Sequence, residues 1–124
     1  MENYESFFSL TPVELLNKLT KRFDYKIPEK ITTKEDMENA QALMLRLTGD
    51  ISYLFALQSY AKIETSRIKR LGLKEDSQDA IDKKEVIANF LDALKQQYNG
   101  VSRAVTIVLA SNEEAKYNGR GSVA

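Results

Sequence analysis

The amino-acid sequence predicts an all-α protein, a long antiparallel helical hairpin with a short N-terminal helix packed on it. Three observations favour this fold class. Residues typical of helix starts occur at separate places along the chain, apolar residues recur at spacings of three and four over two long segments, and a short polar stretch with a glycine separates those segments. With 43% hydrophobic and 29% charged residues, the 124-residue chain has the composition of an ordinary folded domain. We therefore expect a single helical domain over residues 1–124.

The short N-terminal helix is predicted over residues 11–24. Thr11 suits the N-cap position, Pro12 suits the first helical position, and Glu14 would complete a capping box with Thr11. The helix should end before Pro28, because a proline disfavours helix at the residue before it. The apolar residues predicted to form its buried face recur at helical spacing: Val13, Leu16, Leu19 and Phe23.

Two long helices are predicted next, over residues 33–71 and 77–117. Thr32 or Thr33 can cap the first of them, and Gly72 suits the left-handed residue that often ends a helix. The seam of the first long helix alternates spacings of four and three: Ala40, Met44, Leu47, Ile51, Leu54, Gln58, Ala61, Thr65 and Ile68. The same kind of spacing recurs in the second long helix: Ile87, Leu91, Leu94, Tyr98, Val101, Val105 and Val108.

The hairpin is predicted from the length of these helices and the shortness of the linker between them. A helix over 33–71 would be about 60 Å long and cannot bury its own seam. A linker of roughly six residues makes the two helices antiparallel neighbours. With the turn centred near Glu75, Gly49 faces Gly100. A glycine costs about 1 kcal/mol inside a helix, so two glycines at one level indicate close backbone approach, a shared bend, or merely convenient packing.

The two ends of the chain are predicted to be different in kind. The N-terminal arm, residues 1–10, places Tyr4, Phe7 and Phe8 beside acidic residues. This arm either folds back onto the hairpin or docks on a partner or a neighbouring subunit. The last residues, 118–124, are rich in glycine and predict a helix stop followed by a flexible tail.

The segment 101–109 is rich in β-branched residues and could form a strand. We predict a helix, because the heptad spacing continues through it and no second strand-like run is present to pair with it. Nearly every face of this segment is apolar, which is more than a two-helix hairpin can cover. The excess is explained by packing of the first helix, by self-association, or by both. The predicted oligomer or partner interface is Val101, Val105, Val108 and Leu109.

A cationic segment precedes the predicted turn and is the strongest charge feature of the chain. With only Glu64 as a carboxylate inside it, the segment has a net charge of +4. Such a stripe can neutralise phosphates, although it could instead be a solvated helix end stabilised by the helix dipole. Tyr53 and Tyr60, seven residues apart, could stack on bases or simply pack. The candidate nucleic-acid-binding residues are Lys62, Arg67, Lys69, Arg70 and Lys74.

The composition excludes several classes of function. The chain has no histidine and no cysteine, which removes zinc sites of the usual type, cysteine nucleophiles and catalytic triads. The carboxylates do not converge on the predicted seam, so we expect no enzyme, no metal site and no cofactor. The net charge of zero is unlike that of a strongly basic general nucleic-acid binder, although a local basic patch remains compatible with it. The N-terminus does not resemble a secretory signal, and we expect an intracellular protein with no membrane span.

Residues 40–119 show a pattern that resembles small helical proteins of tailed phages. A long helix ends in a Lys/Arg cluster and a glycine turn, and the second helix carries Ser102-Arg103 before an apolar, β-branched stretch. Among these proteins, the chain is similar to the UvsY-type recombination mediators. This resemblance implies an oligomeric ring in the host cytoplasm that binds single-stranded DNA and helps to load a recombinase onto strands coated by a single-strand-binding protein. The family's basic segment would correspond to Arg67, Lys69, Arg70 and Lys74.

A second class of function fits the same residues. The protein could be a phage structural or assembly protein that is associated with the virion, or an inhibitor that binds a host protein. In that case it would assemble or bind its partner through apolar helix faces and make no contact with nucleic acid. Its neutral charge and its apolar segment 101–109 suit this class equally well.

Overall fold

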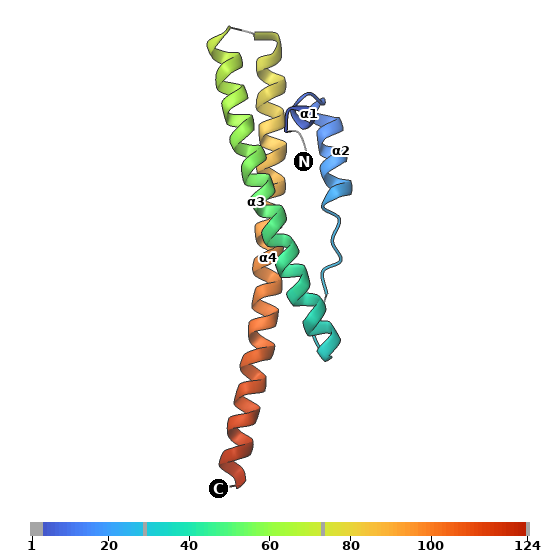
Figure 1. Cartoon of the computed structure of the whole chain (residues 1–124), viewed down its shortest axis with the longest axis vertical. Helices are drawn as coiled ribbons and strands as arrows, with labels where there is room; N and C mark the ends of the chain where they lie inside the picture. Colours follow the sequence, from blue (N-terminus) through green and yellow to red (C-terminus); the bar gives the residue numbers. More distant parts are fainter. Residues whose placement is uncertain (1–3, 29, 73, 124) are drawn as a thin grey trace.

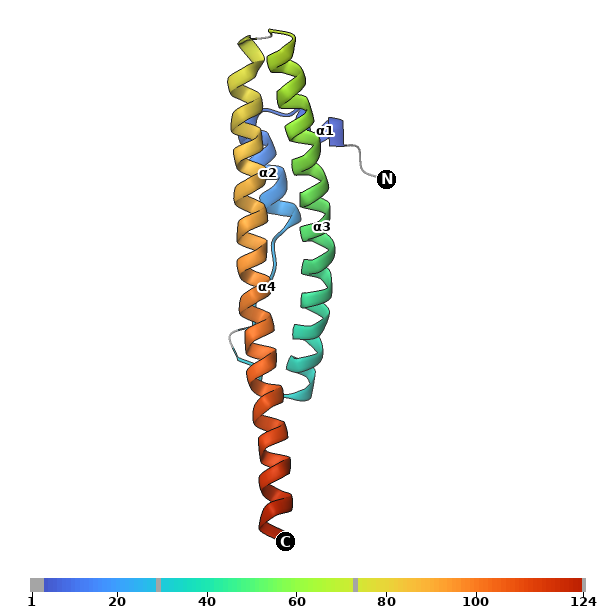
Figure 2. The same cartoon turned by 90° about the vertical axis from the view of Figure 1, so that its left-hand side faces the viewer.

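The chain folds as an all-α helical hairpin with two short helices on one side (Figures 1 and 2). The computed structural model describes residues 4–28, 30–72 and 74–123, and within these it describes no side chains for 74–77 and 113–123. The short helices are α1 (Tyr4–Phe8) and α2 (Pro12–Arg22), and the hairpin helices are α3 (Lys34–Arg70) and α4 (Lys74–Val123). The predicted fold class is confirmed.

Two capping boxes fix the starts of α2 and α3. The sequence predicts the first box in full and, for the second, a threonine cap followed by acidic residues. The Oγ1 atom of Thr11 accepts a hydrogen bond from the backbone N–H of Glu14, and the Glu14 carboxylate accepts one from the Thr11 N–H, both at 3.2 Å. Thr33 and Asp36 form the same reciprocal pair at 3.0 and 3.1 Å. Thr32 adds two further hydrogen bonds to the Asp36 carboxylate. These bonds satisfy backbone donors that a helix start otherwise leaves without partners.

A single left-handed residue ends α3 at the turn of the hairpin. Gly72 has a φ of +71°, which is costly for residues with a Cβ atom, and this confirms the predicted glycine cap. The helix α4 then begins at Lys74, earlier than the predicted start at residue 77. The short turn makes α3 and α4 antiparallel neighbours (Figure 2), although the beginning of α3 turns away from α4 (Figure 1).

The far end of α4 extends beyond the start of α3 (Figures 1 and 2). The helix was expected to end at residue 117, but it continues to Val123 through most of the predicted flexible tail. A glycine lowers helix stability by about 1 kcal/mol but keeps its backbone N–H, so the glycines at 119 and 121 do not by themselves end a helix. The tail prediction is therefore wrong for the backbone of residues 118–123.

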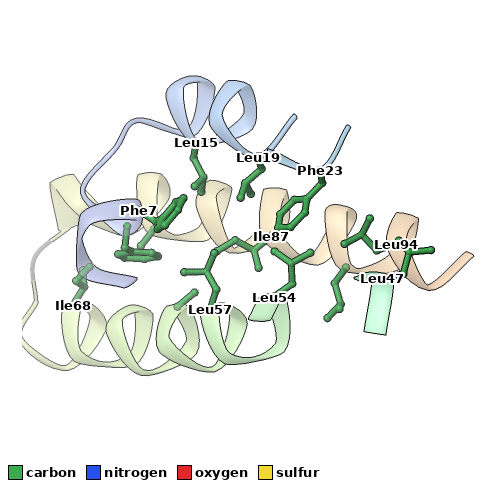
Figure 3. Close-up of a cluster of buried hydrophobic side chains, with 14 residues drawn as sticks. Phe7, Leu15, Leu19, Phe23, Leu47, Leu54, Leu57, Ile68, Ile87 and Leu94 are labelled. Carbon is green, nitrogen blue, oxygen red and sulfur yellow. The ribbon is translucent and has the colours of Figure 1, made fainter. Parts of the chain in front are cut away.

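The main core lies where α1 and α2 cover the α3–α4 hairpin (Figure 3). It confirms most of the predicted seam and adds Leu57 and Ala80, which the regular spacing did not include. Its fourteen buried members are Phe7, Phe8, Leu15, Leu19, Phe23, Leu47, Leu54, Leu57, Ala61, Ile68, Ala80, Ile87, Leu91 and Leu94.

The helix α2 packs through a face that shares Leu19 with the predicted one but uses Leu15 in place of Val13 and Leu16. Leu15 and Leu19 are fully buried, whereas the side chains of Val13 and Leu16 are 66% and 45% exposed. Phe23, just after the helix, was predicted correctly and packs its ring 6.3 Å from that of Phe90 on α4. Both faces satisfy helical spacing, so spacing alone did not decide which of them meets the hairpin.

A second, smaller core closes the hairpin near the start of α3. It consists of Ala40, Val101 and Val105, with Ile31 and Met37 packed against it. No residue of α2 belongs to it, so the expectation that the first helix covers the segment 101–109 is wrong. It is covered instead by Ile31, from the connection between α2 and α3, and by residues of α3 such as Met37.

The predicted glycine pair is at one level of the hairpin but makes no contact inside the chain. A Cβ atom built on Gly49 or on Gly100 would meet no heavy atom within 4 Å. Both residues are exposed on their helices. Close backbone approach within the hairpin is therefore excluded as the reason for these two glycines.

Among the described residues, no helix combines the length and the apolar character that crossing a membrane requires.

Candidate nucleic-acid interface

Helix geometry assigns side chains of α3 to opposite sides of the hairpin. Ala61 is buried against α4, and Tyr60, one residue earlier, packs its ring 5.9 Å from that of Phe8 on α1. Because each helical residue turns by about 100°, Lys62 points to the side away from α1. One heptad later, Lys69 follows buried Ile68 and therefore points to the same side as Lys62. We call this surface, which follows the α3–α4 seam opposite α1 and α2, the open side.

Two lysines of α4 point to the same open side. Lys83 is buried and contacts Phe8 of α1, so Lys84, about 100° further round the helix, points away from α1. Lys95 follows buried Leu94 in the same way. Its ammonium nitrogen lies 4.6 Å from the ring centre of Phe55, which follows buried Leu54 on α3. This contact shows that the open sides of α3 and α4 adjoin.

The open side therefore carries cations from both long helices and one exposed aromatic ring, that of Phe55. None of its four lysines makes an ion pair with a described residue of the chain. Phe55 is 46% exposed, with Lys95 over its face. Asp92 is the carboxylate next to this surface, about 60° beyond Lys95 toward the outside of α4. We call the surface the lysine groove; its members are Lys62, Lys69, Lys84, Lys95 and Phe55.

The predicted cationic segment is thus divided among different surfaces. Lys62 and Lys69 belong to the lysine groove, whereas Arg67 points toward the α1 side. Arg67 Nη2 donates to a Glu64 carboxylate oxygen at 2.9 Å, and this hydrogen bond raises the pKa of the guanidinium. Arg70 is exposed on the outside of α3, away from α4. The side chain of Lys74 lies outside the described residues.

The two tyrosines considered for base stacking are engaged by the N-terminal arm. The ring of Tyr53 lies 5.6 Å from Tyr4 and 6.1 Å from Phe7, and the ring of Tyr60 packs on Phe8. Burial, followed by the nearby charge of Glu64, raises the pKa of Tyr60. Of the two roles considered for these tyrosines, the structure shows packing. The N-terminal arm folds back onto the hairpin, which is one of the two arrangements that the sequence left open.

Lys83 anchors that arm and was missed by the sequence reasoning. Its side chain is 8% exposed, and its Nζ atom donates to the backbone carbonyl of Phe8 at 2.7 Å. That carbonyl ends α1, where a helix leaves acceptors without partners. Lys83 follows Ala80 and precedes Ile87 at core spacing, which was the available signal. This spacing was not recognised as a core position, because lysine is rarely buried in a protein core.

Carboxylates gather on the opposite side from the lysine groove. A cavity of about 410 Å³ lies between α1, α3 and α4 and is lined by Glu5, Glu64 and Asp79, together with Tyr60 and Lys83. Lys83 Nζ also lies 3.7 Å from an Asp79 carboxylate oxygen. The cations around this cavity therefore have partners in the chain. The charges around this cavity do not favour binding of a polyanion. The open side is therefore the candidate site for nucleic acid.

The predicted apolar interface is largely used inside the chain. Val101 and Val105 are 2% and 5% exposed and pack against Ala40, so they are not available to a partner. Val108 is half-buried and lines a cavity with Met37 of α3. Leu109 is exposed, as is Ile107, which was not in the predicted set. Assigning Val101 and Val105 to an interface between molecules is therefore wrong.

The described side chains contain no cluster of three or more residues suited to holding a metal ion. No protein-family model matches the chain, and no curated protein or solved structure matches it significantly.

Proposed function

We propose that this protein is a non-enzymatic binding protein for single-stranded nucleic acid and that the strand lies along the lysine groove. One observation carries the proposal. Four lysines without carboxylate partners among the described residues line one side of the hairpin, on which the ring of Phe55 is also exposed. Lys62 and Lys69 come from α3, and Lys84 and Lys95 come from α4, so the seam between the two helices runs between the two pairs.

The physical basis is the one that single-strand-binding sites share. A cationic groove neutralises successive phosphates, and an aromatic ring stacks on a base without regard to its identity. Each neutralised phosphate releases condensed counterions, so binding weakens as salt rises. A chain with zero net charge can still provide such a site, because carboxylates such as Glu5, Glu64 and Asp79 lie on the opposite side of the hairpin. The expected binding is therefore largely independent of sequence.

Loading of a recombinase is the biological role that we propose for this binding. The support is the resemblance of residues 40–119 to UvsY-type mediators, together with a hairpin that displays cations near its turn. The role is tested by adding the protein to strands covered with a single-strand-binding protein and following recombinase assembly. A mediator would shorten the lag before assembly, and variants with a disabled groove would not.

The binding proposal is tested by replacing the four groove lysines with glutamine, which removes the charge and keeps much of the aliphatic chain. The measurement is fluorescence anisotropy of a labelled oligothymidylate at about 50 and 200 mM salt, a range over which phosphate contacts weaken steeply. The expected result is weaker binding with a shallower dependence on salt.

A control with the same change in net charge separates the groove from general electrostatics. Its four glutamines replace exposed lysines elsewhere on the chain: Lys21, Lys26, Lys30 and Lys34. The control should bind nearly as the parent does. Equal weakening in both variants would show that the groove is not the site, and absence of binding by the parent at low salt would reject the proposed function.

The alternative function is assembly or partner binding without nucleic acid. It is supported by the exposed apolar side chains of Val13 and Leu16 on the outer surface of α2. A phage structural protein or an inhibitor of a host protein would use such a surface. A parent chain that ignores nucleic acid but loses its partner or its assembly on Leu16→Asp would establish this function in place of the first.

A further inference from the structure

The buried residues of the hairpin indicate which residues of α3 and α4 lie at the same level. In two antiparallel helices with the same rise per residue, the numbers of facing residues add up to a constant value. Five pairs of buried residues share one such value, and the members of the pair nearest the turn line the same cavity. From the turn outward, the pairs are Ile68 with Ala80, Ala61 with Ile87, Leu57 with Leu91, Leu54 with Leu94, and Leu47 with Val101.

The lysine groove therefore carries its cations at three levels. Lys95 adjoins Phe55 at the level farthest from the turn. The register of the buried pairs puts Lys84 within two residues of the level of Lys62, so these two lysines form the middle level. Lys69 forms the level nearest the turn. At about 1.5 Å per residue, the segment from Phe55 to Lys69 covers about 21 Å along the hairpin.

The next level beyond Phe55, away from the turn, is uncharged. Thr48 precedes Phe55 by seven positions and Lys62 follows it by seven, so all three point to the open side. On α4, Ser102 follows Lys95 by seven positions and lies at about the level of Thr48. The Oγ1 atom of Thr48 donates to a backbone carbonyl of its own helix at 2.9 Å. At this level the open side therefore presents hydroxyl groups in place of lysines.

We propose that the lysine groove holds a short unpaired segment of about four to seven nucleotides, with the base at one end on Phe55 and the phosphates between Phe55 and the turn. This inference rests on the proposed function. A strand in duplex geometry advances about 3.4 Å per nucleotide, and an unpaired strand can extend to about twice that. The distance of about 21 Å from Phe55 to Lys69 then corresponds to about four to seven nucleotides.

The substrate class is therefore a short single-stranded segment, such as an overhang of a duplex, and a long single-stranded tract is not required. A phosphate beyond Phe55 would meet the hydroxyls of Thr48 and Ser102, which release no counterions. At the other end, α3 ends one residue after Lys69, where the seam reaches the turn. Nucleotides outside this segment should add little affinity.

The first experiment measures affinity against length, with oligothymidylates of two to sixteen nucleotides in isothermal titration calorimetry of the full chain at about 50 mM salt. We expect the affinity to rise at least tenfold up to a plateau at about four to seven nucleotides. Beyond it, the additional positions on a longer strand should raise the affinity by no more than about fivefold. With four lysines in contact, the logarithm of the binding constant should fall with that of the salt concentration at a slope of about −3.

The outcomes of this series distinguish the length of the segment from the proposed function itself. Affinity that continues to rise steeply beyond about ten nucleotides would overturn the short segment and leave single-strand binding in place. Absence of binding at every length would reject both. A duplex with an overhang of plateau length should bind about as tightly as the free strand, and equal affinity for a blunt duplex would overturn the substrate class.

Adding one level of cations tests where the strand lies. Thr48→Lys with Ser102→Lys extends the groove past Phe55 by about 10 Å, so the plateau should move to strands about two or three nucleotides longer. The control is Asn17→Lys with Thr20→Lys, which adds the same charge at exposed positions of α2. Thr20 matches Thr48, because its hydroxyl also donates to a backbone carbonyl four residues earlier. The control should keep the parent's plateau, and a folded groove variant that keeps it too would overturn the placement.

A fluorescent base analogue at successive positions of a strand of plateau length locates the stacked base. Its emission should change most at one end of the strand, because only Phe55 offers an exposed ring among the described residues of the groove. The change should disappear in the Phe55→Ala variant. Equal changes at every position, or a largest change in the middle of the strand, would overturn the assignment of Phe55 to the end of the segment.

Discussion

The ammonium nitrogen of Lys95 on α4 lies 4.6 Å from the centre of the Phe55 ring on α3. This contact joins the two long helices on the side that α1 and α2 leave uncovered. Among the described aromatic side chains, Phe55 is the exposed one, since the other rings are buried or half-buried. The pairing places an aromatic face and a cation together where a single-stranded nucleic acid could contact both.

The Phe55→Ala variant should lose affinity for a single-stranded oligonucleotide without losing its fold. Stacking of a base on an aromatic side chain contributes about 1–3 kcal/mol, so the dissociation constant should rise about tenfold. Fluorescence anisotropy measures the change. Leu45→Ala is the control, because Leu45 is an exposed apolar residue of α3 at another level of the hairpin. Equal affinities of parent and Phe55→Ala would show that the ring takes no part in binding.

The Lys83→Met variant should release α1 from the hairpin. Methionine keeps the apolar stem but leaves the carbonyl of Phe8 without its donor, which costs about 1.5–3 kcal/mol for a charged hydrogen bond. Urea unfolding measures the stability loss, and hydrogen exchange of residues 4–8 locates it. Lys84→Met serves as the control on the open side. Unchanged exchange in α1 would contradict an anchoring role for Lys83.

The buried face of α2 can be distinguished from its exposed face by two substitutions. Leu15→Ala should lower the free energy of unfolding by about 2–5 kcal/mol, because it removes a fully buried side chain from the core. Val13→Ala, at a position 66% exposed, should change it by less than about 0.5 kcal/mol. Chemical denaturation of both variants checks the comparison. The reverse order of effects would mean that α2 packs as the sequence spacing first indicated.

Acid should weaken the start of α3 through Asp36. Hydrogen bonds from Thr32, followed by those from Thr33, hold the pKa of this carboxyl below its ordinary value. A group with a lowered folded-state pKa contributes stability above its unfolded pKa of about 3.9 and loses it as the pH falls through the folded value.

The Asp36→Asn variant should therefore be less stable than the parent near pH 7 and should approach it as the pH falls below about 4. Urea unfolding of both chains across this range measures the difference. Asp24→Asn, an exposed carboxylate after α2, is the control. A constant difference between parent and Asp36→Asn at all pH values would contradict the role of the Asp36 charge.

The helices and their caps were predictable because their signals are local. Thr11, Thr33 and Gly72 act through residues within one turn, and the structure confirms all three. The seam of the hairpin was predictable because its spacing persists over many turns. The face of α2 was predictable only in part. Leu19 was identified, but Val13 and Leu16 satisfy helical spacing as well as Leu15 does, and only the shape of the hairpin distinguishes them.

The candidate site was predictable only in part, because it depends on how two distant segments adjoin. Lys62 and Lys69 are close to each other in the chain and were identified. Lys84 and Lys95 join them through the register of the hairpin, which composition does not reveal. Arg67 was included among the nucleic-acid-binding residues because of its charge. In the structure its side chain is bonded to Glu64, and the direction of a side chain cannot be read from the sequence. For Tyr53 and Tyr60 the sequence left both stacking and packing open, because aromatic spacing does not say which segment will cover the rings.

The combination of zero net charge with a local lysine groove has a kinetic consequence. At physiological ionic strength a charge acts over only about 8 Å, so the groove attracts a strand only after the two have nearly met. Encounter should then proceed at the ordinary rate of an uncharged protein, with little steering from a distance. Salt should act mainly on the lifetime of the complex, shortening the time for which a bound strand stays in place.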